Sequence, residues 1–240
     1  MSRLTLMARY PRYAIYFVTA RGDTLDRFGA ELLGYDAWTG EDLPFPPDVD
    51  KAEPNWCKLT ADPRKYGFHA TLKAPFALAE GKAETDLRAA CAAFAEKPQS
   101  IPLIVPVVDA ISGFIAVIPK ERSIELEQLA AGCVIALDAF RAPLTADDRA
   151  RRNPDRLTQR QRDYLDRWGY PYVMEEFRFH MTLTGRIDQP MRERVVSMLR
   201  RRFAATGLEM LAIDAIALFR QDDAESRFRI IDRWQLRAPV

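Results

Sequence analysis

Histidine and cysteine are scarce in this chain, and their scarcity narrows what it can do. The 240 residues include 2 histidines and 3 cysteines. Cys57, Cys91 and Cys133 are odd in number and have no C-x-x-C spacing. This argues against a disulfide framework and against a structural zinc site. We therefore expect a protein of the reducing cytoplasm.

The chain also lacks a large net charge and a long apolar run. The 35 basic residues balance the 34 acidic ones to a formal charge of +1, so no overall field favours long nucleic acid or an anionic membrane. No apolar run approaches the ~18–20 residues that span a bilayer, and residues 1–9 do not read as a signal peptide. The sequence contains no Walker loop, dinucleotide fingerprint or HExxH string. We expect no membrane association.

Both histidines lie in one repeated pattern. Residues 66–72 read YGFHATL, and residues 177–183 read FRFHMTL. Each contains Phe-His-x-Thr-Leu in a segment of strand-like composition. Because a strand turns successive side chains to opposite faces, His69 shares a face with Thr71, and His180 with Thr182. The chain thus holds two copies of an imidazole beside a hydroxyl.

Hydrophobic periodicity predicts a mixed order of strands and helices. We expect strands at residues 12–18, 66–76, 101–108, 113–118, 177–186, 210–220 and 227–236. We expect helices at residues 24–33, 82–95, 123–140 and 191–203, a polar helical stretch at 145–168, and an irregular loop at 35–65. Each half therefore has a histidine strand, a helix and further strands, which indicates a structural duplication.

Two such motifs suit acid–base chemistry on a phosphate. Imidazole has an unperturbed pKa of ~6.5, so one ring can accept a proton while the other donates one. The threonine hydroxyls can bind the non-bridging oxygens. This scheme needs no metal or cofactor. A zinc site is disfavoured because the matched neighbours are threonines rather than Cys, Asp or Glu.

The paired His-x-Thr motifs resemble the signature of the 2H phosphoesterase superfamily, which includes RNA 2′,5′-ligases and cyclic nucleotide phosphodiesterases. The strings YGFHATLK at 66–73, WGYPY at 168–172 and FRFHMTLT at 177–184 resemble its DUF1045 branch. The resemblance implies an α+β fold in one domain over 1–240. It implies two pseudo-symmetric antiparallel-sheet lobes with outer helices around a central cleft. It further implies that His69, Thr71, His180 and Thr182 are catalytic.

The resemblance also implies a small phosphorylated substrate, such as a nucleotide or ribose cyclic phosphate. The DUF1045 branch is associated with phosphonate utilisation, where a ribosyl 1,2-cyclic phosphate is an expected intermediate. Three functions stay open: a cyclic phosphodiesterase, an RNA 2′,5′-ligase or RNA-end phosphodiesterase, and a non-enzymatic phosphate-binding protein. The near-zero net charge disfavours RNA.

Further residues are candidates for substrate binding. Regular alternation would aim Lys73, Arg178 and Thr184 into the same cleft as the histidines, although both cations read equally as rim charges. Arg141 follows a predicted helix and either reaches the cleft or caps that helix.

Tyr16 and Tyr172 can stack on a substrate, but a partly buried structural tyrosine is the ordinary alternative. The arginine-rich stretch at 149–163 reads as a solvated helix face, or as a patch for a phosphorylated ligand or RNA.

Overall fold

The computed structural model describes residues 9–239. Residues 1–8, in which we expect no signal peptide, and residue 240 lie outside the described residues. Of the helices in the described chain, none has the length and apolar character needed to cross a membrane.

The core element is a seven-stranded sheet in which every neighbouring pair is antiparallel. Its order is β11-β10-β1-β4-β8-β7-β6. The strands are β1 (Arg12–Phe17), β4 (Ala70–Ala77), β6 (Pro106–Ile111), β7 (Phe114–Pro119), β8 (Met181–Thr182), β10 (Ala215–Gln221) and β11 (Arg229–Gln235). Two small ladders join β2 (Tyr35–Asp36) to β3 (Glu41–Asp42), and β5 (Leu103–Ile104) to β9 (Leu211–Ala212).

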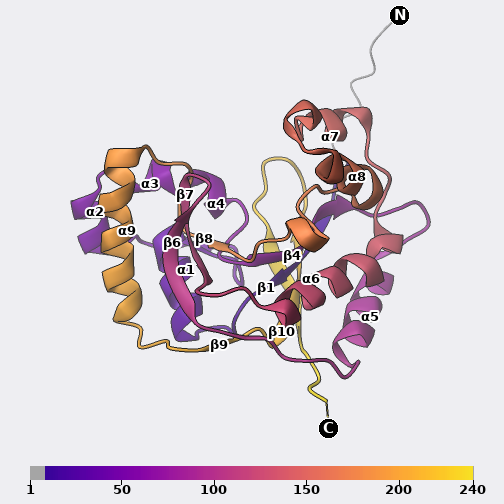
Figure 1. Ribbon diagram of the computed structural model, residues 1–240, viewed down its shortest axis with the longest axis horizontal. Helices are drawn as coiled ribbons and strands as arrows, with labels where there is room; N and C mark the ends of the chain where they lie inside the picture. The colour runs from indigo at the N-terminus through magenta and orange to yellow at the C-terminus, as the bar shows by residue number, and fades with distance from the viewer. Residues whose placement is uncertain (1–8, 240) are drawn as a thin grey trace, which may run out of the picture.

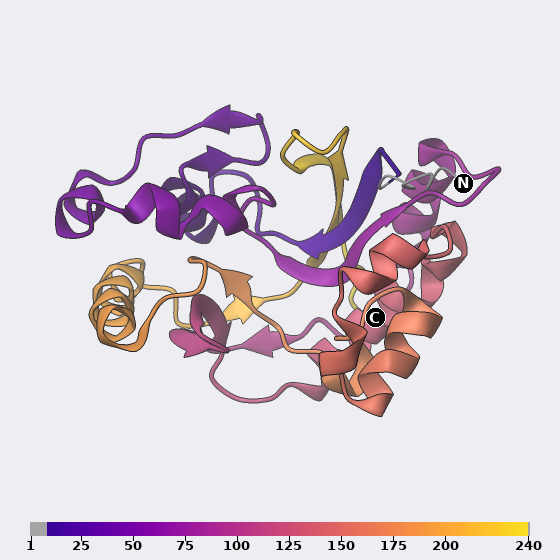
Figure 2. The same ribbon diagram turned by 90° about the horizontal axis from the view of Figure 1, so that it is seen from above.

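Helices lie at both ends of this sheet (Figures 1 and 2), with α1 and α9 at one end and α5 to α8 at the other. The α-helices are α1 (Thr24–Leu33), α2 (Pro47–Ala52), α3 (Trp56–Leu59), α4 (Ala61–Arg64), α5 (Glu84–Ala95), α6 (Ile124–Ala136), α7 (Ala146–Ala150), α8 (Gln159–Trp168) and α9 (Gln189–Ala204). Short 3-10 turns are η1 (Asp138–Phe140), η2 (Pro154–Arg156) and η3 (Met174–Glu176). The predicted α+β class with an antiparallel sheet is confirmed.

Successive side chains of β1 point into two different hydrophobic clusters, one on each face of the sheet. Tyr13, Ile15 and Phe17 pack into the main hydrophobic core, together with apolar residues of α1, α5, α6 and α9. Ala14 and Tyr16 point to the other face, into a smaller cluster. Helices thus cover one face of the central strands, and the opposite face is left for polar chemistry.

Two predictions about regular structure are wrong. The segment 35–65 is not an irregular loop, because it holds β2, β3 and three short helices. The second histidine strand covers two residues rather than 177–186. It ends early because the N–H groups of Leu183 and Thr184 both point at the Ile115 carbonyl, and Gly185 then donates to Leu59.

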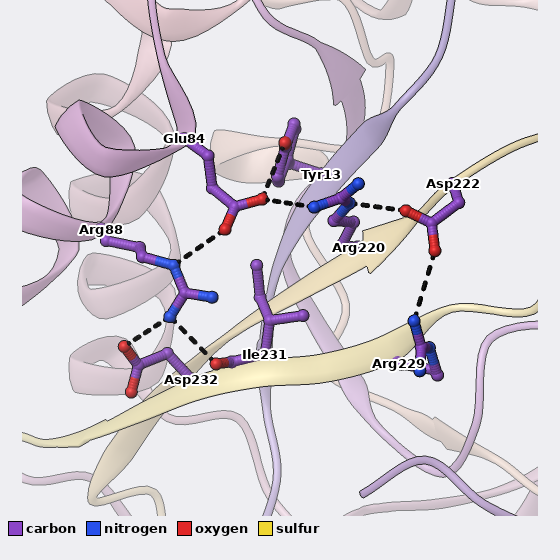
Figure 3. A network of polar contacts seen from close by, with 8 residues as sticks. All are labelled: Tyr13, Glu84, Arg88, Arg220, Asp222, Arg229, Ile231 and Asp232. Carbon is purple, nitrogen blue, oxygen red and sulfur yellow. Dashed lines mark hydrogen bonds and ion pairs between the residues drawn. The ribbon is translucent and has the colours of Figure 1, made fainter. Parts of the chain in front are cut away.

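A polar network fastens α5 to the sheet (Figure 3). The Glu84 carboxylate accepts hydrogen bonds from the Tyr13 hydroxyl and the Arg220 guanidinium, each at 3.0 Å. Arg88 bridges Glu84 at 3.0 Å and Asp232 at 2.9 Å. These side chains are partly exposed, so each pair contributes at most about 1 kcal/mol. Their main effect is to fix α5 against β1, β10 and β11.

Candidate functional site

The two histidine motifs lie side by side in the middle of the sheet. Strands β4 and β8 are antiparallel neighbours, with Ala70 opposite Met181. These are the central residues of the two His-x-Thr patterns, and both are buried in the main core. Since side chains alternate along a strand, the histidine and threonine of each motif project from the opposite face.

This register brings all four polar side chains together. Continuing it by one residue on either side sets His69 beside Thr182 and Thr71 beside His180. The two histidines are then diagonal neighbours across the strand pair, a relationship with a separation of about 7–8 Å. A tetrahedral phosphate is small enough to contact both imidazoles at that spacing.

Each imidazole is oriented by its own backbone. The Nδ1 atom of His69 lies 2.9 Å from the Gly67 carbonyl oxygen, and Nδ1 of His180 lies 2.7 Å from the Arg178 carbonyl oxygen. A carbonyl only accepts, so both Nδ1 atoms carry hydrogen and Nε2 is the basic atom of the neutral ring. Nε2 of His69 lies 3.3 Å from Thr71 Oγ1.

Glycines allow this first motif to pack closely. Gly67 has a φ of +74°, and a Cβ there would lie 2.7 Å from the Ala37 Cβ. The Phe68 ring covers Gly29 of α1, where an added Cβ would lie 2.0 Å from the ring. Phe68 thus anchors the residue before His69 to a helix, while Gly67 turns its carbonyl toward the ring.

Burial lowers the pKa of both imidazoles. His69 stacks on Tyr16, with ring centroids 3.7 Å apart. Desolvation lowers the pKa of His69 from 6.5 to about 4, the Gly67 hydrogen bond opposes this, and charge on His180 lowers it further. Burial also lowers the pKa of His180, against the effect of the Arg178 carbonyl.

A cavity of about 420 Å³ opens at His180 and Thr71. Arg178 and Tyr172 lie in its wall. Tyr172 is 46% exposed, and its ring meets that of Tyr170 edge to face at 5.6 Å. The Arg178 guanidinium donates to the Phe177 carbonyl at 2.8 Å. Substrate contacts by Arg178 and Tyr172 stay a prediction.

The expectation that Lys73 points into the cleft is wrong. Its side chain is 3% exposed, and its Nζ donates to Asp138 Oδ1 at 3.0 Å. Thr71 lies opposite Tyr16, whereas Lys73 lies opposite the adjacent residue Ile15, so β4 contains an extra residue between them. Such a bulge shifts the alternation and turns Lys73 toward the core.

Thr184 and Arg141 are also placed differently from prediction. Thr184 is fully buried, its Oγ1 accepts from the Ile115 N–H at 3.1 Å, and it donates to the Gly185 carbonyl. Arg141 lies in the wall of a separate cavity of about 220 Å³. Its guanidinium binds Asp138 at 2.8 Å and the Arg167 carbonyl at 2.9 Å, and Arg141 is not among the described residues that line the cavity at His180 and Thr71.

Tyr16 stands behind the site rather than in it. It is 1% exposed, and burial raises its pKa well above 10.0. Its role is to support the His69 ring. Sequence reasoning missed two tyrosines, Tyr66 and Tyr170. Tyr66 lies 6.2 Å from the His69 ring, and Tyr170 lines the cavity of His180. Tyr66 lies in the string YGFHATLK at 66–73, and Tyr170 lies in WGYPY at 168–172. These strings could have marked both tyrosines as candidates.

Within residues 9–239, no three His, Cys, Asp or Glu side chains are grouped so that they could hold a metal ion.

Comparison with curated proteins finds relatives of about twice the length. The chain is 36% identical over 220 residues to "Ribose 1,5-bisphosphate phosphokinase PhnN" of Janthinobacterium sp. (strain Marseille), covering 88% of this chain and 48% of that one. A protein of the same name from Laribacter hongkongensis (strain HLHK9) is 32% identical over 220 residues, covering 91% and 50%. The chain therefore spans about half the length of the curated relatives it matches.

Solved structures are similar at a lower level. E. coli LigT complexed with NADP+ matches with a TM-score of 0.42 and 13% identity, covering 96% of this chain and 99% of that one. The conserved protein of unknown function ATU0111 from Agrobacterium tumefaciens str. C58 matches with a TM-score of 0.45 and 10% identity, covering 92% and 85%.

A family model decides the relationship. The model described as "Protein of unknown function (DUF1045)" matches residues 71–229. This span includes Thr71, the second histidine motif and most of the sheet. The resemblance to the DUF1045 branch is confirmed, and the chain belongs to the DUF1045 family.

Proposed function

We propose that this protein is a phosphodiesterase that opens a small cyclic phosphate ester by two-histidine acid–base catalysis. One observation carries the proposal: the register of β4 against β8, which sets His69, Thr71, His180 and Thr182 on one face. The resemblance of the paired motifs to 2H phosphoesterases supports the same reaction class.

The proposed reaction assigns one role to each imidazole. A water oxygen attacks phosphorus, and Nε2 of His69 takes the water proton. The bond from phosphorus to the leaving ring oxygen breaks, and protonated His180 gives that oxygen its proton. The hydroxyls of Thr71 and Thr182 donate to the non-bridging oxygens as their charge grows. The product is a phosphomonoester with a free hydroxyl.

The assignment follows from the surroundings of the two rings. His69 is held against Tyr16, with a pKa of about 4, and stays neutral as a base needs. His180 opens onto the cavity. Burial lowers the pKa of His180 against the effect of the Arg178 carbonyl, and a bound anionic substrate favours the protonated ring that the acid role needs.

We infer a pentose cyclic phosphate as the substrate. The relatives are named for a kinase of ribose 1,5-bisphosphate, but this chain lacks the G-x-x-x-x-G-K-[ST] loop of nucleotide-binding kinases. Opening a ribosyl 1,2-cyclic phosphate at the 2-oxygen leaves a 1-phosphate, which is one of the two phosphates in the named kinase substrate. This chemistry favours hydrolysis over the ligase and sensor alternatives.

The test replaces each histidine with asparagine. The Asn amide retains a donor near Nδ1 and removes Nε2, so His69→Asn and His180→Asn should stay folded and lose at least about 100-fold in kcat/KM on a cyclic phosphodiester. Activity should persist in strong chelator. Folded variants with wild-type activity would end the proposal.

Thr182 and Thr184 lie two residues apart in the chain and provide a matched pair of variants, one in the proposed site and one outside it. Thr182→Val removes a hydroxyl proposed to bind phosphate and should lower kcat/KM with little change in Tm. Thr184→Val removes a buried hydroxyl bonded to Ile115 and Gly185. It should lower Tm and leave kcat/KM of the folded protein near wild type. The reverse pattern would contradict the placement of the site.

A further inference from the structure

A second cavity beside the histidines is lined by arginines. It measures about 220 Å³, and its wall includes Arg9, Arg12, Arg141, Arg151 and Arg152, with Asp148 as its one carboxylate. These residues come from β1 and the segment just before it, from the segment after η1, and from α7 and the residues that follow it. Helix α7 lies with α8 at one end of the molecule (Figure 1). We refer to it as the arginine cavity.

Two of these guanidinium groups are not neutralised. Arg141 is paired with Asp138, and Arg151 with Asp148. Arg12 instead donates to the neutral Gln221 amide, with its Nε at 2.9 Å from the oxygen. Arg152 lies over the Tyr170 ring, 5.0 Å from its centroid. Within residues 9–239, no carboxylate is within ion-pair distance of Arg12 or Arg152.

Aromatic rings connect the arginine cavity to the histidines. Tyr66 lines the cavity and stacks on Phe228 at 5.3 Å. Phe228 also lies under the Arg12 guanidinium at 5.6 Å and 6.3 Å from Tyr16, the ring on which His69 stacks. Arg12 and His69 thus contact opposite sides of one aromatic cluster.

Tyr170 makes the second connection. Its ring supports Arg152 of the arginine cavity and also lines the cavity that contains His180. Tyr170 therefore contacts groups of both cavities. A substrate that reaches both would carry one phosphate at the histidines and a second anionic group among the arginines. The planar guanidinium fork suits the oxygens of a phosphomonoester.

We infer that the arginine cavity binds a phosphomonoester on the same substrate whose cyclic phosphodiester lies between His69 and His180. This inference rests on the proposed function and narrows its substrate to a cyclic phosphate that carries a second, terminal phosphate. Arg12 and Arg152 supply the uncompensated charge, and Tyr66 and Tyr170 each contact groups of both phosphate positions. Within the arginine-rich stretch at 149–163, the inference assigns Arg152 to ligand binding, which is one of the two readings that the sequence left open.

The experiment compares matched substrates that differ by one phosphate. They are ribose 1,2-cyclic phosphate with and without a 5-phosphate, and adenosine 2′,3′-cyclic phosphate with and without a 5′-phosphate. Wild-type kcat/KM should be about 10- to 100-fold higher for the phosphorylated member, the effect of one or two charge-assisted hydrogen bonds. The pair with the larger ratio tells whether the phosphate belongs to a sugar or a nucleotide.

Arg152→Gln should remove this preference and leave the unphosphorylated substrates unaffected. Arg152→Lys keeps the charge without the planar fork, so its preference for the phosphorylated substrate should lie between those of wild type and Arg152→Gln. The Lys variant replaces the Gln variant if the Gln variant does not fold. Arg160→Gln is the control, because Arg160 is an exposed arginine of α8 outside the cavity. Equal kcat/KM for both members of each pair, unchanged in Arg152→Gln, would overturn the inference while the proposed function stands.

A binding measurement distinguishes failure of the proposed function from failure of the anion site. Calorimetric titration with ribose 5-phosphate should show affinity that Arg152→Gln weakens about 10-fold or more and His69→Asn leaves nearly unchanged. If no cyclic phosphate is hydrolysed but this pattern holds, the proposed function fails and the anion site stands. If ribose 5-phosphate does not bind, or binds equally to Arg152→Gln, the arginine cavity is not a phosphate site.

Discussion

Acid should destabilise this protein through His69, and the size of the effect follows from its surroundings. The pKa of His69 is lowered from 6.5 to about 4, chiefly by burial against Tyr16. The unfolded chain therefore binds a proton near pH 6.5 that the folded protein does not. The stability that this neutral ring contributes is fully present above pH 6.5 and is lost as the pH falls toward 4, at about 1.4 kcal/mol per pH unit.

Between pH 7 and pH 5 the expected loss is about 2 kcal/mol. The measurement is the free energy of urea unfolding for wild type and His69→Asn at both pH values. Other titrating groups are shared by the two proteins, so the stability advantage of wild type over the variant isolates the histidine. That advantage should shrink by about 2 kcal/mol at pH 5. An advantage that is the same at both pH values would refute the burial argument, as would an NMR titration of His69 with a midpoint near 6.5.

Further predictions follow from the same contacts. Asp138→Ala leaves the buried Lys73 ammonium without its carboxylate and should lower the free energy of urea unfolding by about 3 kcal/mol. Lys73→Met should change that free energy by only about 1 kcal/mol and should keep kcat/KM. A loss of activity in Lys73→Met would contradict the placement of Lys73 outside the site. Gly67→Ala should lower both Tm and kcat/KM, because its φ is +74° and its Cβ would meet Ala37, while Gly22→Ala, with a φ of +80° and open space, should cost only backbone strain. Inorganic phosphate should raise the midpoint of the His180 NMR titration, since a bound anion favours imidazolium; an unchanged midpoint at saturating phosphate would count against anion binding there.

Local periodicity was enough to predict that each histidine shares a strand face with a threonine. A period of two places a histidine and the threonine two residues later on one face whatever the rest of the fold does. The ends of α1, including the left-handed Gly34 at its C-terminus, were also readable because caps are local signals. The α+β class followed from the order of such elements.

Tertiary structure decided how these pieces meet. The pairing of β4 with β8 joins residues from the two halves of the chain, and no local pattern encodes that register. The bulge in β4 depends on how β1 pairs with it, so Lys73 turned to the core against its own alternation. The arginine cavity likewise assembles residues from β1 and α7 that are distant in sequence. Sequence alone indicated the regular alternation along each strand, because that follows from backbone geometry. Long-range pairing decided where the alternation breaks, as at Lys73, and which residues share a cavity.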